Sequence, residues 1–146
     1  MRRLLVLLFS VFFAWIWMTS ASPSMTHAMG YHATSYWCNN TNYPLVAMRM
    51  GVDHYDDLSS AYIAQHWSDE WSDYKLCVCN IVVVKRDTNK AVATDLARVL
   101  IEESEDGPSF YAEQDGQWVL LRNYGYMEAY YNTGWVLMHY FNGLPI

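Results

Sequence analysis

The sequence predicts an α+β fold that is mainly antiparallel β, a small barrel or sandwich with one helix packed on it. In residues 116–141 the triplet Trp-Val-Leu occurs twice, each time after a glycine-bearing turn, which is typical of antiparallel strands. Residues 75–86 are apolar at both alternating sets of positions, which predicts a central strand covered on both faces. In residues 55–72, apolar side chains recur every three or four positions, which predicts the single helix.

The remaining segments fit between these elements. Residues 45–52 alternate in polarity and predict a strand. Residues 91–103 fit a helix or a strand, and the second half slightly favours a strand. The pair Asp115-Gly116 is a hairpin signal between strands expected at residues 110–113 and 118–122.

The N-terminus has the order of a secretory signal peptide. Arg2 and Arg3 precede an apolar run, and small residues ending at Ala21 follow it. We therefore expect a signal peptide over residues 1–21, with cleavage after Ser24 as an alternative, and a secreted, extracellular mature chain without a membrane span. A signal retained as a membrane anchor is the other interpretation.

The domain organisation follows from this start. After the signal peptide, residues 22–36 are expected to form a flexible N-terminal arm, and residues 37–146 a single globular β-rich domain that contains a disulfide bond.

The chain is acidic, with a formal net charge of −6 that becomes more negative once Arg2 and Arg3 are removed. An acidic surface repels phosphate backbones, so nucleic acid is excluded as an expected partner. Basic partners are favoured instead.

Three cysteines leave one unpaired in a secreted protein. Cys77 and Cys79 are two positions apart on a predicted strand, where a bond between them would be strained. We expect Cys38 to pair with Cys77 or Cys79. The remaining thiol is then either buried or bonded to another chain, in a disulfide-linked partner or a homodimer.

Asn39-Asn40-Thr41 is an acceptor triplet for N-glycosylation. It predicts a glycoprotein with the glycan at Asn39, in an exposed loop.

Two other chemistries are alternatives to simple binding. Methionine and histidine ligands suit copper, and four of them lie close together near the expected mature N-terminus: Met25, His27, Met29 and His32. A copper-binding protein is therefore the alternative function, although these residues also fit an unstructured terminus. No other metal or cofactor is expected.

A small secreted hydrolase is the second alternative. His66 and Glu70 would stand one turn apart on the expected helix, and Asp56 and Asp57 are paired acids. A surface ion pair explains the first pair as well, and no recognisable catalytic motif accompanies either one. We expect no catalytic residues and no enzyme.

The segments 115–122 and 133–141 resemble the end of an SH3-like barrel of the secreted or bacterial type, and the resemblance extends over roughly residues 95–141. There a Gly-x-Trp strand is followed by a hairpin, a Gly-aromatic-aliphatic strand and a final tyrosine. The resemblance implies that Trp118 and Tyr140 line a ligand groove and that residues 96–103 form an earlier barrel strand.

The same region is rich in aromatic residues, and a domain of this size cannot bury all of them. Some are expected to pack as cross-strand pairs in the core, and exposed ones are favoured at recognition surfaces. The sequence thus predicts a secreted, non-enzymatic interaction protein that binds a protein, peptide or glycan through an aromatic-rich β surface, and the expected binding residues are Trp118, Tyr124, Tyr126, Tyr131, Trp135 and Tyr140.

Overall fold

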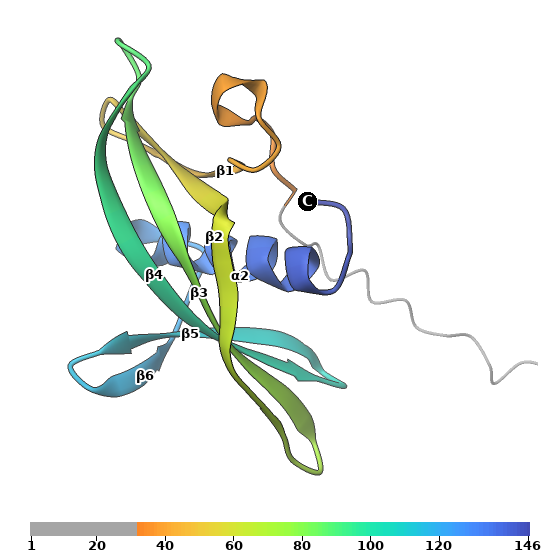
Figure 1. Cartoon of the computed structure of the whole chain (residues 1–146). Helices are drawn as coiled ribbons and strands as arrows, with labels where there is room; N and C mark the ends of the chain where they lie inside the picture. Colours follow the sequence, from red (N-terminus) through yellow and green to blue (C-terminus); the bar gives the residue numbers. More distant parts are fainter. Residues whose placement is uncertain (1–31) are drawn as a thin grey trace, which may run out of the picture.

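The computed structural model describes residues 32–146 as one antiparallel sheet with a helix packed against it. The strands are ordered as they occur in the chain: β1 (Leu45–Arg49), β2 (Val52–Ser68), β3 (Ser72–Lys85), β4 (Lys90–Ser104), β5 (Gly107–Gln114) and β6 (Gln117–Leu120). The sheet curls, and helix α2 (Glu128–Phe141) lies against one of its faces (Figure 1). Two short 3₁₀ turns complete the fold, η1 (Trp37–Asn39) and η2 (Gly125–Met127). The predicted fold class is confirmed.

The helix expected over residues 55–72 was wrong, because this segment is most of β2 and the start of β3. Two bulges, between Asp57 and Tyr62 and between Ile63 and Gln65, interrupt the pairing of β2 with β3. Each bulge shifts the alternation of side chains, so the apolar residues of this strand lose the two-residue period and imitate helical spacing.

The turn between β2 and β3 is stabilised by Asp69, which was expected to lie inside the helix. Its Oδ1 atom accepts hydrogen bonds from the backbone N–H groups of Trp71 and Ser72, at 2.8 and 2.9 Å. A short acidic side chain that binds the backbone two and three residues later favours a turn over a helix.

The strand expected around Trp135 was wrong as well, because the second Trp-Val-Leu lies within α2. Buried residues recur there with helical spacing: Ala129, Asn132, Thr133, Val136 and Leu137. Asn132 and Thr133 are polar, so the helical spacing of the buried residues is not visible as an apolar pattern in the sequence. The segment 133–141, which carries half of the resemblance to SH3-like barrels, is thus helical.

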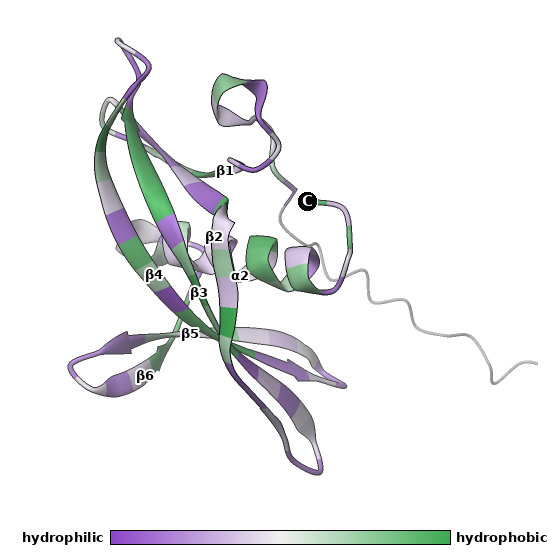
Figure 2. Ribbon diagram, in the orientation of Figure 1, coloured by the Kyte–Doolittle hydropathy of each residue, from purple (hydrophilic) through white to green (hydrophobic). Residues whose placement is uncertain are grey.

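The core lies on both faces of β3, as the sequence predicted. One face packs against α2, and its buried residues include Cys77, Cys79, Ile81, Val99, Ile101, Phe110 and Leu137. On the other face, Trp37 and Tyr43 from the segment before β1 pack against Leu45, Tyr55, Val82 and Val84. Figure 2 shows the resulting apolar band along β3, flanked by polar hairpin ends. Residues 91–103 lie within β4, which settles their assignment as strand.

The predicted disulfide is not formed, since all three cysteines in the described part of the chain are free. Cys38 is exposed in η1, whereas Cys77 and Cys79 are buried on β3. The two buried thiols point toward α2, and the segment around η1 covers the opposite face of the sheet. The sheet itself therefore separates Cys38 from both expected partners.

Candidate binding surface

One face of the sheet carries α2, and the other face is covered only in part. The segment from Tyr36 to Pro44 covers the end of that face nearest the turn between β3 and β4. Beyond Asn80, toward the turn between β2 and β3, none of the residues 32–146 forms an element that covers it. An uncovered area of this kind has to be solvated or occupied by a partner.

We call this uncovered area the open face and define it by three rows of side chains that follow the register across the strands. The first row is Trp67, Tyr74, Glu102 and Ser109. The second row is Gln65, Leu76, Leu100, Tyr111 and Leu120. The third row is Tyr62, Val78, Arg98, Glu113 and Trp118.

The open face has an apolar floor and an aromatic rim. Leu76, Val78 and Leu100 are buried although no element among residues 32–146 lies over them, because the larger side chains around them shield them from water. Trp67 and Trp118 on the rim remain 43% and 41% exposed. Large aromatic rings around a shielded apolar centre are a common arrangement at the centre of protein–protein interfaces.

Trp67 and Tyr74 form a cross-strand pair whose rings are nearly parallel. Their ring centroids are 5.4 Å apart, and the ring planes meet at 8°. Each ring restricts the other, so a ligand that stacks here meets side chains that have already lost most of their rotamer freedom.

Glu102 is held between two phenols in the same area. Its Oε1 accepts hydrogen bonds from Ser72 Oγ at 3.2 Å and Tyr74 OH at 3.1 Å, and its Oε2 accepts one from Tyr111 OH at 2.6 Å. The hydrogen bond from Tyr111, followed by that from Tyr74, lowers the pKa of Glu102 below its usual value. The open face therefore presents a fixed negative charge beside its aromatic rings.

The third row contains an ion pair. Arg98 Nη1 lies 2.8 Å from Glu113 Oε2, and both side chains are partly exposed. Such a pair contributes little to stability. It orients both charges next to Trp118, because Trp118 on β6 pairs with Glu113 on β5.

The structure separates the six binding residues expected from the sequence. Trp118 lies on the open face, whereas Tyr140 is exposed near the end of α2, on the side of the sheet that carries the helix. The structure therefore does not bring these two residues together in one groove. Trp135 is buried in the core against Phe110, with ring centroids 5.2 Å apart.

Tyr124, Tyr126 and Tyr131 belong to a second region, beside the connection from β6 to α2. Tyr124 and Tyr131 line a hollow of about 420 Å³ together with Phe110, Leu121 and Arg122. Tyr126 is exposed and lines two neighbouring hollows. Charged side chains line these hollows as well: Arg122 in the first, Glu113 in the second, and Arg49 and Glu128 in the third.

The sequence did not indicate Tyr62, Trp67, Tyr74, Glu102 or Tyr111 as binding residues. The helix expected over residues 55–72 placed Tyr62 and Trp67 on the wrong element. The overlooked signal was the Asp69 turn with an aromatic residue on either side, because it predicts a hairpin that pairs Trp67 with Tyr74.

The pairs considered for hydrolysis are not formed as expected. His66 Nε2 lies 2.8 Å from Asp73 Oδ1 across the hairpin, and no helical turn joins it to Glu70. Asp56 is fully buried on the α2 side, where it accepts a hydrogen bond from Thr133, and Asp57 accepts hydrogen bonds from Ser59 instead. Neighbours on a strand face opposite sides of a sheet, so these acids do not form a catalytic pair.

Metal ligands do not gather in the described part of the chain. Within residues 32–146, no group of three or more His, Cys, Asp and Glu side chains is arranged to hold a metal ion. Met25, His27 and Met29 lie outside the described residues. His32 contacts His139, with ring centroids 6.0 Å apart.

Of the two remaining sequence signals, the glycosylation triplet lies in the structure as expected, with Asn39 and Thr41 exposed. The expected signal peptide and most of the N-terminal arm lie outside the described residues. Among residues 32–146, the helices are too short or too polar to cross a membrane.

Comparisons with protein-family models, curated proteins and solved structures find no match to this chain.

Proposed function

We propose that this chain is a secreted, non-enzymatic binding module that holds a protein or peptide partner on the open face. The observation that carries the proposal is the uncovered arrangement of Trp67 and Tyr74 beside the carboxylate of Glu102. The aromatic rings offer a large contact area at a low cost in side-chain entropy. The carboxylate of Glu102 orients the partner and favours positively charged groups.

The apolar side chains of the open face favour a peptide over a sugar. Sugar sites depend on polar groups around a ring, whereas the side chains that the open face exposes around its buried floor include Tyr62, Trp118 and Leu120. The exposed rings of Trp67 and Trp118 could also stack on sugar faces, so a glycan remains the competing ligand.

The proposed extracellular location rests on the signal-like N-terminus and the exposed glycosylation triplet. Both features are independent of the open face. A glycan at Asn39 would leave the open face accessible, because η1 lies over the other end of that side of the sheet.

Two side chains of matched exposure allow a clean test of the open face. Trp118 is 41% exposed on the open face, and Tyr140 is 42% exposed on the opposite side of the sheet. The immobilised domain is used to select binders from a random peptide library displayed on phage, and a glycan array is probed in parallel. Selected peptides are then measured against Trp118→Ala and Tyr140→Ala.

The proposal expects peptides that lose about tenfold or more in affinity with Trp118→Ala and keep their affinity with Tyr140→Ala. Peptides that respond equally to both changes would contradict the open face as the binding surface. Binding on the glycan array without any selected peptide would contradict the choice of partner.

A further inference from the structure

The open face is bounded on one side by a free edge of the sheet. β1 pairs with the first part of β2, from Val52 to Tyr55. The segment before β1 extends this pairing, because the N–H groups of Asp56 and Leu58 donate to the carbonyl oxygens of Pro44 and Asn42. From Ser59 to Ser68, no strand among residues 32–146 pairs with this edge of β2. A row of backbone donors and acceptors is therefore available there.

This edge lacks the side chains that usually prevent strand addition. Between Ser59 and Trp67 the sequence has no Lys, Arg, Asp, Glu or Pro. Charged residues and proline are the common means of protecting a free edge. The two bulges before Gln65 limit the regular part of the edge to a short stretch, from Gln65 to Ser68. The edge thus suits a short added strand better than a long, flat self-association.

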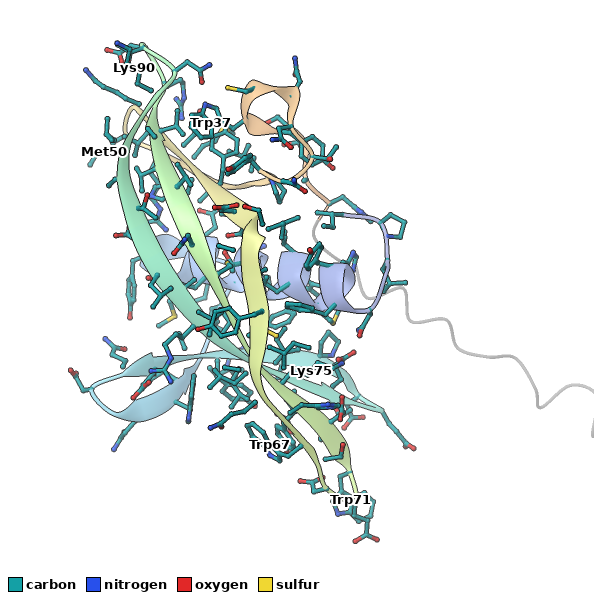
Figure 3. The ribbon with its side chains drawn as sticks, in the orientation of Figure 1. Trp37, Met50, Trp67, Trp71, Lys75 and Lys90 are labelled. Atoms are coloured by element: carbon teal, nitrogen blue, oxygen red, sulfur yellow. The ribbon has the colours of Figure 1, made fainter. Side chains whose placement is uncertain are left out.

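Acidic groups surround this short stretch. Asp69 and Glu70 lie in the adjoining turn, and Asp73 and Glu102 flank Tyr74. Hydrogen bonds, with that from Ser68 the largest cause, lower the pKa of Asp73 to about 2, and backbone hydrogen bonds lower the pKa of Asp69. The nearby lysine, Lys75, is already engaged by Asp73 and Glu103. Figure 3 shows Trp67, Trp71 and Lys75 together at this end of the molecule.

From this combination we infer that the free edge of β2 receives an extended, Lys- or Arg-bearing segment of the partner, which adds a strand beside Gln65–Ser68. The inference rests on the proposed function and names its partner. Alternate side chains of the added strand point to the open face, and adjacent strands are about 4.8 Å apart. A cationic side chain there lies within reach of the Trp67 ring, where the cation–π attraction operates, and Asp69 and Glu70 adjoin the same stretch in the turn.

The test uses synthetic, fluorescently labelled peptides of about ten residues, the upper range of ordinary strands. The probe alternates Arg with Val and Thr. One control replaces every Arg with Glu, and a second keeps the Arg residues but carries N-methyl groups on alternate backbone amides. N-methylation removes hydrogen-bond donors without changing the charge, so it separates strand addition from simple electrostatic attraction.

Binding is measured by fluorescence anisotropy with the wild-type protein and the variants Trp67→Ala and Trp71→Ala. Trp71 is the matched control, because it lies at the same hairpin but is 76% exposed and outside the open face. The inference expects binding of the Arg peptide, with a loss of about tenfold for the Glu peptide, for the N-methylated peptide and for Trp67→Ala. Trp71→Ala is expected to bind as wild type does.

Hydrogen exchange supplies a second measurement that does not depend on the variants folding well. The bound Arg peptide is expected to slow the exchange of backbone amides in residues 65–68 of the wild-type protein. Equal affinity of the N-methylated peptide, or no protection of these amides, would overturn strand addition. Library-selected peptides that depend on Trp118 without protecting residues 65–68 would overturn this inference and leave the proposed function intact.

Discussion

Thr133 on α2 donates a hydrogen bond to the carboxyl group of Asp56 on β2, with 2.8 Å between Thr133 Oγ1 and Asp56 Oδ1. Both residues are fully buried, and Asp56 Oδ2 has no partner among the described residues. Burial raises the pKa of Asp56 to about 8, against the smaller opposing effect of the hydrogen bond from Thr133. The contact that joins the helix to the sheet therefore contains a carboxyl group that stays protonated at neutral pH.

This proton makes stability depend on pH. Between the ordinary pKa of aspartate and about 8, the folded chain keeps the proton while the unfolded chain releases it. The free energy of unfolding therefore falls as pH rises, by roughly 1.4 kcal/mol per pH unit from this group alone. We expect the melting temperature of the wild-type protein to fall from pH 5 to pH 8.

Asp56→Asn isolates this effect, because the amide oxygen can still accept from Thr133 but the side chain cannot ionise. Burial lowers the pKa of His54, so this residue makes the free energy of unfolding rise with pH, opposite to Asp56. Wild type and Asp56→Asn share His54, so its effect cancels when the two are compared. The variant is expected to show a smaller fall than wild type in a thermal unfolding series over pH. Parallel curves for the two proteins would contradict the role of Asp56.

Gly134 allows α2 to approach β5 closely. A Cβ atom at this position would lie 2.6 Å from two ring atoms of Phe110, which is buried and cannot move away. Gly134→Ala is expected to lower the free energy of unfolding by about 1–3 kcal/mol, although alanine favours helix formation. Chemical denaturation measures the change.

A second substitution tests whether Phe110 is the cause. Phe110→Leu destabilises by itself, but it provides room for the added methyl group, so the double variant is expected to lose less than the sum of the two single losses. Strictly additive losses would show that Gly134 is needed for another reason.

The cysteines give a direct test of the corrected disulfide assignment. Cys38 is exposed, and burial raises the pKa of Cys77 to about 12 and that of Cys79 further still. Under native conditions a maleimide is expected to label Cys38 alone, and after unfolding all three thiols, as counted by intact mass. Labelling of a single thiol after unfolding without reductant would restore the disulfide first predicted from the sequence.

The triplet at Asn39 predicts a glycan on an exposed 3₁₀ turn. Expression through a eukaryotic secretory pathway is expected to give a product whose mass falls on treatment with a peptide N-glycosidase. Thr41→Ala removes the acceptor triplet and is expected to abolish this difference. Secretion of an unmodified wild-type chain would contradict the prediction.

The sequence predicts the sheet well where local pattern and burial agree. The apolar run in β3 identified a strand covered on both faces, and Asp115-Gly116 identified the hairpin between β5 and β6. In both cases a single local feature, an unbroken apolar run or a turn pair, determines the structure.

The sequence failed where tertiary contacts outweigh local pattern. The bulges in β2 exist because of its pairing with β3, and the polar stripe residues Asn132 and Thr133 are buried because they bond to Val46 and Asp56. These partners are far apart in the chain and leave no local signal. Trp118 was the one expected binding residue that lies on the open face, because a strand already fixed its orientation.

The indole N–H signals in a two-dimensional NMR spectrum test the central claim most directly. On addition of a library-selected peptide, the signals of Trp67 and Trp118 are expected to shift, because both rings lie on the open face. The signal of Trp135, buried on the α2 side, is expected to stay in place. Unchanged signals of Trp67 and Trp118 at saturating peptide would contradict binding at the open face.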